Sequence, residues 1–150
     1  QNAIPIINYN DAVSESENRR MELAALAKSQ AEVHECVDND ETASLVACLV
    51  HAETLLLLTS VDGIYTNPAD SSTIIEEIAG KDAYELVENI ESYKKYCEGA
   101  SRKGANGAKA KLEYAKQAAA QGTRVLIANA KYSIREILAG EVRCTKIHIR

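Results

Sequence analysis

The stretch Thr54-Leu55-Leu56-Leu57-Leu58-Thr59-Ser60 decides the fold, because its four consecutive leucines are the strongest strand signal in the chain. An apolar run of this length that ends in polar and turn-forming residues is typical of a strand in the interior of a sheet. The segment that follows, Val61-Asp62-Gly63-Ile64-Tyr65, contains a turn signal. The sequence therefore predicts a strand over residues 54–58 with polar residues just past its carboxyl end.

Helical patterns flank this strand on both sides. Upstream, apolar residues at helical spacing predict a mostly buried helix over about residues 42–52, with Cys48 as a small buried hydrophobe. Downstream, similar patterns predict helices over about residues 83–97 and from Ala108 to a stop at Gly122. A capping box at Ser133 and Glu136 predicts a further short helix that ends at Gly140.

Four more segments have strand character. We expect a buried parallel strand over residues 4–7, an edge strand over 73–78, a strand over 125–128, and an edge or half-exposed strand over 144–149. An Ala- and Glu-rich stretch at about residues 14–36 is predicted to be a helical surface insertion. Alternation of strands and amphipathic helices implies an α/β domain with a mainly parallel sheet and helices on both faces.

Composition narrows the class of protein. A chain of 150 residues suits one domain, and its charge of −5, from 17 Lys and Arg against 22 Asp and Glu, argues against sequence-independent binding of nucleic acid. No apolar run approaches the ~20 residues of a membrane helix. The four cysteines lack the spacing of a metal site or disulfide framework, which favours a reducing, cytoplasmic location. Because the chain opens without an initiator Met, we expect that Gln1 is not its natural start.

A basic, glycine-containing segment precedes the helix that begins near Ala108. Gly104 and Gly107 allow close approach of the backbone to a ligand, and Lys103, Lys109 and Lys111 add positive charge around a helix N-terminus. This combination suits a phosphate group, although the Walker A pattern is absent. A solvated loop with incidental lysines is the alternative that the residues leave open.

Acidic and amide residues follow strand ends or start helices at several points. Asp11 follows residues 4–7, Asp62 follows residues 54–58, and Asp38 and Asp40 precede the helix over 42–52. Carboxylates gathered at one edge would repel one another unless cations balance them, which could be a ligand, a metal or the lysines above. Taken singly, Asp38 and Asp40 are also good helix caps.

Taken together, five segments resemble the glutamate 5-kinase family of the amino acid kinase superfamily. They occur in the family's order along the whole chain: Ile4-Pro-Ile-Ile-Asn-Tyr-Asn-Asp-Ala-Val13, Val37-Asp-Asn-Asp40, Leu55-Leu-Leu-Leu-Thr-Ser-Val-Asp-Gly-Ile-Tyr-Thr66, Gly104-Ala-Asn-Gly-Ala-Lys-Ala-Lys111 and Val125-Leu-Ile-Ala-Asn-Ala130. The resemblance covers only about the second half of a kinase domain. It implies a partial three-layer αβα sandwich that transfers the γ-phosphoryl group of ATP, with Mg²⁺, to the side-chain carboxylate of L-glutamate.

The resemblance also implies roles for individual residues. The catalytic residues would be Lys111, which stabilises the transferring phosphoryl group, and Asp40, which organises the lysines. Glutamate would be held by Asn8, Asp11, Asp38 and Asn39. The nucleotide would contact Thr59, Ser60, Asp62, Tyr65, Gly104, Ala105, Asn106, Gly107, Ala108 and Lys109. The metal ligands are not identified, and the complete protein is expected to be a homo-oligomer without nucleic-acid or membrane partners.

This sequence departs from the family pattern in several places. Tyr9 stands where the family has Glu. Thr59 and Ser60 match two adjacent family residues that contact the nucleotide, and Ser60 stands where the family has Asp. The segment over residues 104–111 contains alanines and an asparagine where Thr, Gly and Met are typical. The stretch between Asp11 and Asp38 is longer than usual. Two alternatives therefore stay open: a related kinase with another acceptor, and a binding domain without catalytic activity.

Overall fold

The computed structural model describes residues 4–7, 39–97 and 107–150, and the chain divides into two units, Gln1–Thr42 and Ala43–Arg150. In the first unit, residues 4–7 have no regular secondary structure, and Ile4 and Ile6 are more than nine-tenths exposed. The predicted buried strand at this position is therefore wrong in the described structure. A strand requires a hydrogen-bonded neighbour, and none of the described strands pairs with these residues. The predicted insertion over 14–36 lies outside the described residues.

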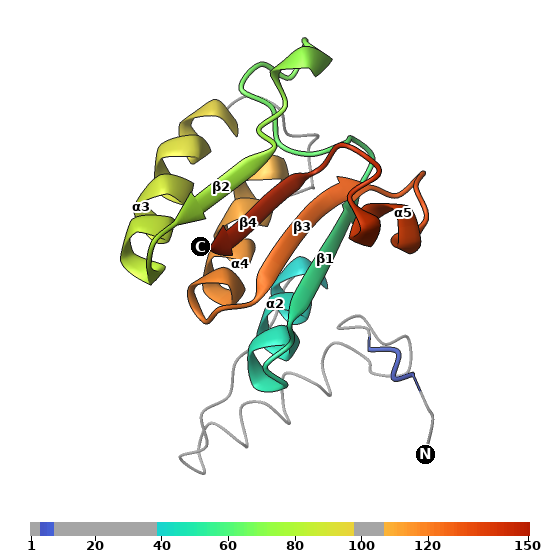
Figure 1. Cartoon of the computed structure of the whole chain (residues 1–150), viewed down its shortest axis with the longest axis vertical. Coiled ribbons are helices and arrows are strands. Elements are labelled where there is room, and N and C mark those ends of the chain that lie inside the picture. The colour runs from blue at the N-terminus through green and yellow to red at the C-terminus, as the bar shows by residue number, and fades with distance from the viewer. Residues whose placement is uncertain (1–3, 8–38, 98–106) are drawn as a thin grey trace, which may run out of the picture. The chain divides into compact units, whose positions relative to one another are not determined.

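The second unit is built on a four-stranded sheet with the order β1-β3-β4-β2 (Figure 1). β1 (Thr54–Thr59) runs parallel to β3 (Arg124–Asn129), and β2 (Glu77–Gly80) runs parallel to β4 (Thr145–Ile149). The two pairs meet where β3 and β4 run antiparallel. The mainly parallel α/β sheet predicted from the sequence is confirmed.

Helices cover both faces of this sheet. One face packs against α2 (Asn39–Leu49), α3 (Ala83–Lys94) and α4 (Gly107–Ala120) in the larger apolar core. The other face packs against α5 (Ile134–Ala139) in a smaller core. β3 serves both cores, because Val125 and Ile127 belong to the first and Leu126 and Ala128 to the second. The predicted three-layer arrangement follows from this alternation.

The predicted edge strand over 73–78 exists but begins later. β2 lies at the edge of the sheet and starts at Glu77, after a 3-10 turn, η1 (Ser71–Thr73), and an isolated antiparallel bridge between Ile74 and Tyr65. Asp70 caps that turn by accepting a hydrogen bond from the Ser72 amide at 2.9 Å. The backbone is already extended at Ile74, but the Ile75 amide donates to the Ile64 carbonyl at 2.7 Å, so this segment pairs with the turn after β1 before it joins the sheet.

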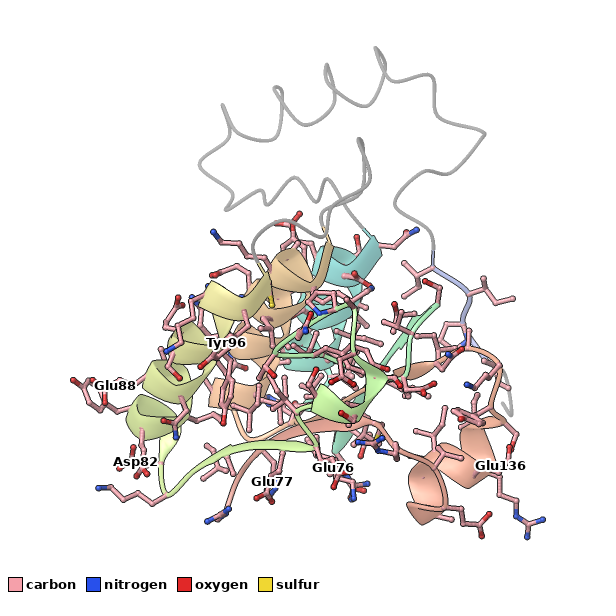
Figure 2. All side chains as sticks on the ribbon, turned by 90° about the horizontal axis from the view of Figure 1, so that it is seen from above. Glu76, Glu77, Asp82, Glu88, Tyr96 and Glu136 are labelled. Atoms are coloured by element: carbon pink, nitrogen blue, oxygen red, sulfur yellow. The ribbon has the colours of Figure 1, made fainter. Side chains whose placement is uncertain are left out.

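Helix boundaries follow local capping signals. Asp82 begins α3 by accepting a hydrogen bond from the Glu85 amide at 2.9 Å, and Figure 2 shows Asp82 at this end of the helix. α3 continues into a short 3-10 helix, η2 (Lys95–Cys97). The capping box of Ser133 and Glu136 and the left-handed Gly140 after α5 confirm the predicted ends of that helix.

β4 is half-exposed, as its alternating pattern predicts, but it is not an edge strand. It lies between β3 and β2, with Thr145 and Ile147 fully buried and Lys146 exposed on the opposite face. The alternation reports that one face of the sheet is covered here, and it carries no information about neighbouring strands.

Candidate functional site

The site is built where the carboxyl ends of β1 and β3 lie side by side, and we call this end of the sheet the carboxyl edge. These strands are parallel neighbours in register, with Thr59 opposite Asn129. The ladder extends one step past the strands, because the Ala130 amide donates to the Thr59 carbonyl at 2.8 Å. Residues that follow either strand therefore project from the same edge, which is where ligands bind in open α/β sheets.

Four polar residues meet at this edge, and we call Ser60, Asp62, Asn129 and Lys131 the strand-end cluster. The Asn129 side-chain amide donates to Asp62 Oδ1 at 2.9 Å and to the Ser60 carbonyl at 3.3 Å. Lys131 Nζ lies 3.0 Å from Asp62 Oδ1, and the Lys131 amide donates to Asn129 Oδ1 at 3.1 Å. The cluster thus connects the segments that follow two different strands.

The electrostatics of the cluster keep its charges in place. The Lys131 ammonium, together with the Asn129 amide and against a smaller opposing effect of burial, lowers the pKa of Asp62. Tyr132 and Asp62 raise the pKa of Lys131, whose ammonium lies 4.6 Å from the centre of the Tyr132 ring. Asp62 is therefore a charged hydrogen-bond acceptor at neutral pH.

The turn after β1 is fixed from both sides. The Asp62 amide donates to the Tyr65 hydroxyl at 3.3 Å, and the Ile64 amide donates to the buried Thr145 Oγ1 at 2.8 Å. A Cβ atom on Gly63 would lie only 2.5 Å from Thr145 Oγ1, so the close approach of the turn to β4 requires glycine. This packing holds Asp62 at the strand end.

Helix α4 begins at the same edge of the sheet. α4 leads into β3 through the left-handed Gly122, so the helix and strand run in opposite directions, and its first turn lies toward the carboxyl ends of β1 and β3 (Figure 1). Gly107, Ala108, Lys109 and Lys111 belong to its first two turns. A 14-residue helix with amide donors and lysines at this end suits an anionic ligand.

The structure places the predicted site residues unequally. Ser60, Asp62 and Tyr65 lie together after β1, and Thr59 is the last residue of that strand. The predicted residues of α4 lie in its first two turns, toward the same end of the sheet. Asn39 and Asp40 lie in the first turn of α2, within the first unit. The remaining predicted residues lie outside the described ones: Asn8, Asp11, Asp38, Gly104, Ala105 and Asn106. Convergence of the four aspartates therefore stays a prediction.

Sequence reasoning missed Asn129, Lys131 and Tyr132 as members of this edge. The signal was present, because these residues directly follow the predicted strand over 125–128, just as Ser60 and Asp62 follow theirs. What the sequence lacked was evidence that these two strands are neighbours. Only the pairing of β1 with β3 brings Asn129 to Asp62.

The cysteines that the structure describes are structural. Cys48, Cys97 and Cys144 are unpaired and buried, and burial raises the pKa of each thiol, which disfavours the reactive thiolate. The predicted role of Cys48 as a small buried hydrophobe is confirmed. Within residues 39–97 and 107–150, no group of three His, Cys, Asp or Glu side chains could hold a metal ion by itself.

Comparison with known proteins assigns the chain consistently to one family. The model of the amino acid kinase family matches residues 1–129. A glutamate 5-kinase from Clostridium perfringens is 32% identical over 142 residues, covering 92% of this chain and 46% of the relative. A glutamate 5-kinase from Leifsonia xyli is 36% identical over 138 residues, covering 92% of this chain and 43% of the relative. The chain therefore spans less than half the length of these curated relatives.

A solved structure shares the fold. Carbamate kinase from Giardia lamblia, bound to AMP-PNP, aligns with a TM-score of 0.58 and 22% identity, over 80% of this chain and 34% of that chain. At this identity the likeness supports the αβα architecture and nothing finer. In the described part of the chain, no helix has the combined length and apolar character that crossing a bilayer requires.

Proposed function

This chain belongs to the amino acid kinase family, and from that premise we propose that it is the nucleotide-side part of a glutamate 5-kinase. The observation that carries the proposal is the similarity to glutamate 5-kinases at 32% and 36% identity across 92% of the chain. The grouping of Ser60, Asp62 and Tyr65 at the carboxyl edge of β1, where α4 also begins, supports a ligand site in this region.

The proposed reaction transfers the γ-phosphoryl group of ATP to L-glutamate. An oxygen of the glutamate side-chain carboxylate forms a bond to the γ-phosphorus, the bond from that phosphorus to the β,γ-bridging oxygen breaks, and ADP leaves with the electron pair. Glutamyl 5-phosphate is the other product. Because the carboxylate is already ionised, the reaction needs no strong base, and positioning and charge stabilisation supply the catalysis.

ATP would occupy the edge at which β1, β3 and α4 meet. The first turn of α4 offers backbone amides to the phosphates, and Lys109 and Lys111 offer cationic charge. Lys111 would stabilise the charge that develops on the transferring group. Mg²⁺ would enter as the MgATP complex, since magnesium is commonly held by substrate phosphates and only one or two carboxylates.

Glutamate would be bound by residues of the N-terminal part of the chain. Asp11 and Asn39 suit the substrate's ammonium and carboxylate groups, with Asn8 and Asp38 beside them in the sequence. Asp40 would arrange the catalytic lysines by charge attraction. These roles rest on the family resemblance of the two Asn-Asp segments.

The test is ATP-dependent formation of glutamyl hydroxamate by the full-length natural protein and its Lys111→Ala variant. We expect kcat to fall about 100- to 1,000-fold, because one stabilising cation is lost from the transition state. Lys81→Ala is the matched control, since Lys81 is an exposed lysine that pairs with Glu85 on α3. Circular dichroism and thermal unfolding establish that both variants are folded.

The outcomes separate three possibilities. Full activity of folded Lys111→Ala would contradict the role of this lysine. Phosphorylation by the wild-type protein of another acceptor in a substrate panel, without reaction of glutamate, would instead favour a related kinase. Binding of ATP without turnover on any acceptor would identify a non-catalytic domain.

A further inference from the structure

Asn129 and Lys131 hold the carboxylate of Asp62 from a second strand of the sheet, and no role follows for them from the proposed function. We propose that Asn129 and Lys131 are positioning residues of the nucleotide site, which orient Asp62 to accept hydrogen bonds from the ribose hydroxyls. The inference rests on the proposed function, because it concerns the same nucleotide. It further specifies that the strand-end cluster recognises the ribose of that nucleotide.

The contacts leave one side of the carboxylate available. The two contacts that the Asp62 carboxylate makes with described side chains, the Asn129 amide at 2.9 Å and the Lys131 ammonium at 3.0 Å, both fall on Oδ1. Asp62 retains partial solvent exposure, at 27% of its side chain. Oδ2 can therefore accept hydrogen bonds from a ligand while Oδ1 keeps the side chain in one orientation.

Rigid elements support this arrangement. Asn129 is the last residue of β3, and its amide also holds the Ser60 carbonyl, so the end of one strand fixes the turn that follows the other. The Asn129 side-chain oxygen in turn accepts from the Lys131 amide at 3.1 Å. A carboxylate that is held by side chains on a strand end is more precisely positioned than one on an isolated loop.

The chemistry of the cluster selects the ligand group. A charged carboxylate repels phosphate but accepts hydrogen bonds from hydroxyl groups, and an acidic side chain commonly plays this role toward the ribose in α/β nucleotide sites. Phosphates are better served by the amides and lysines at the start of α4. Because the Asp62 carboxylate and the start of α4 suit different parts of the nucleotide, we assign the ribose to Asp62 and the phosphates to α4.

The experiment measures binding of ATP and of dideoxy-ATP, which lacks both ribose hydroxyls, by calorimetry on the full-length natural protein. Wild type should bind ATP more tightly than dideoxy-ATP. We expect Asn129→Ala to weaken ATP binding about tenfold and Lys131→Ala about threefold, with dideoxy-ATP binding nearly unchanged in both. Lys131→Arg should restore most of the affinity, and Lys146→Ala, at an exposed lysine of β4, should bind both nucleotides like wild type.

The Lys131→Ala variant keeps the test decisive if Asn129→Ala fails to fold, because the Lys131 side chain is 55% exposed. Unchanged ATP affinity in Lys131→Ala, or equal losses for ATP and dideoxy-ATP, would overturn the inference while leaving the proposed kinase intact. Failure of wild type to bind either nucleotide would overturn both. ATP binding that discriminates as expected, without phosphorylation of glutamate, would support the inference and reject only the proposed acceptor.

Discussion

Gly80 is the last residue of β2 and packs directly against the backbone of α3. A Cβ atom at this position would lie 2.3 Å from the Leu86 amide nitrogen and 2.7 Å from the Leu86 Cα. Both neighbours are backbone atoms of a helix, so they cannot move aside as a flexible side chain could. The close packing of β2 on α3 thus depends on the absence of a side chain at one residue.

We therefore expect Gly80→Ala to reduce the free energy of unfolding by about 1–3 kcal/mol, the usual range for an overpacked core. Urea denaturation followed by circular dichroism measures this change. The neighbouring Lys81→Ala, at a side chain that is 79% exposed, should change stability by no more than about 0.5 kcal/mol. Equal stability of Gly80→Ala and wild type would show that the strand and helix separate at little cost.

Asp62 shows what residue identity alone can indicate. Its position after a predicted strand and inside a turn was enough to predict a site residue, because strand ends are where α/β sheets bind ligands. Its partners Asn129 and Lys131 lie 67 or more residues further along the chain. No local pattern connects residues at such a separation.

At the scale of elements, α3 and α4 are joined by four alternating charges. Lys116 Nζ lies 2.7 Å from Glu91 Oε1 and 2.7 Å from Glu113 Oε1, and Lys94 contacts both carboxylates as well. Although partial burial opposes it, the Glu113 and Glu91 carboxylates raise the pKa of Lys116. The network links two helices that also share the larger core.

A double-mutant cycle on Glu91→Ala and Lys116→Ala should give a coupling free energy of about 0.5–1 kcal/mol, at the upper end for pairs near the surface. The comparison pair is Lys81, which precedes α3, and Glu85 in its first turn; their charged groups lie 3.5 Å apart with side chains 79% and 41% exposed, and the pair should give about 0.3 kcal/mol. Urea unfolding of the single and double variants measures both values. A smaller coupling between Glu91 and Lys116 than between Lys81 and Glu85 would contradict a stabilising role for the network.

At the scale of the whole molecule, paired carboxylates make stability depend on pH. Lys131 lowers the pKa of Asp62, Arg150 that of Glu77, and Lys116 that of Glu91 and Glu113, from ordinary values of 3.8 for Asp and 4.5 for Glu. A carboxylate with a lowered folded-state pKa stabilises the folded state fully above its unfolded pKa. That contribution is lost as pH falls through the folded pKa.

The free energy of unfolding should therefore change little from neutral pH to about pH 5 and fall steadily below about pH 4.5. Urea denaturation at a series of pH values measures the profile. Added salt should flatten the acid limb, because these pairs are partly exposed and screened. A profile that stays level to about pH 3 would show that the ion pairs contribute nothing to stability.

The sequence by itself determined most of the elements that the structure describes, and their class. The leucines of residues 55–58, the capping box at Ser133 and the glycines at 122 and 140 act through neighbouring residues, so their consequences can be read locally. Alternation in residues 144–149 likewise showed that one side of that strand is uncovered. These signals report burial and backbone conformation, which depend on the nearby sequence.

Only the tertiary structure decided which strands are neighbours and in which direction they run. β4 lies between β3 and β2 and runs antiparallel to β3, although its alternating pattern also suited an edge strand. Residues 4–7 have the pattern of a strand but no described partner. Strand pairing is a contact between distant segments, and the same apolar pattern fits several partners. For that reason, the sequence predicted Asp62 at the site, and only the fold placed Asn129 and Lys131 beside it.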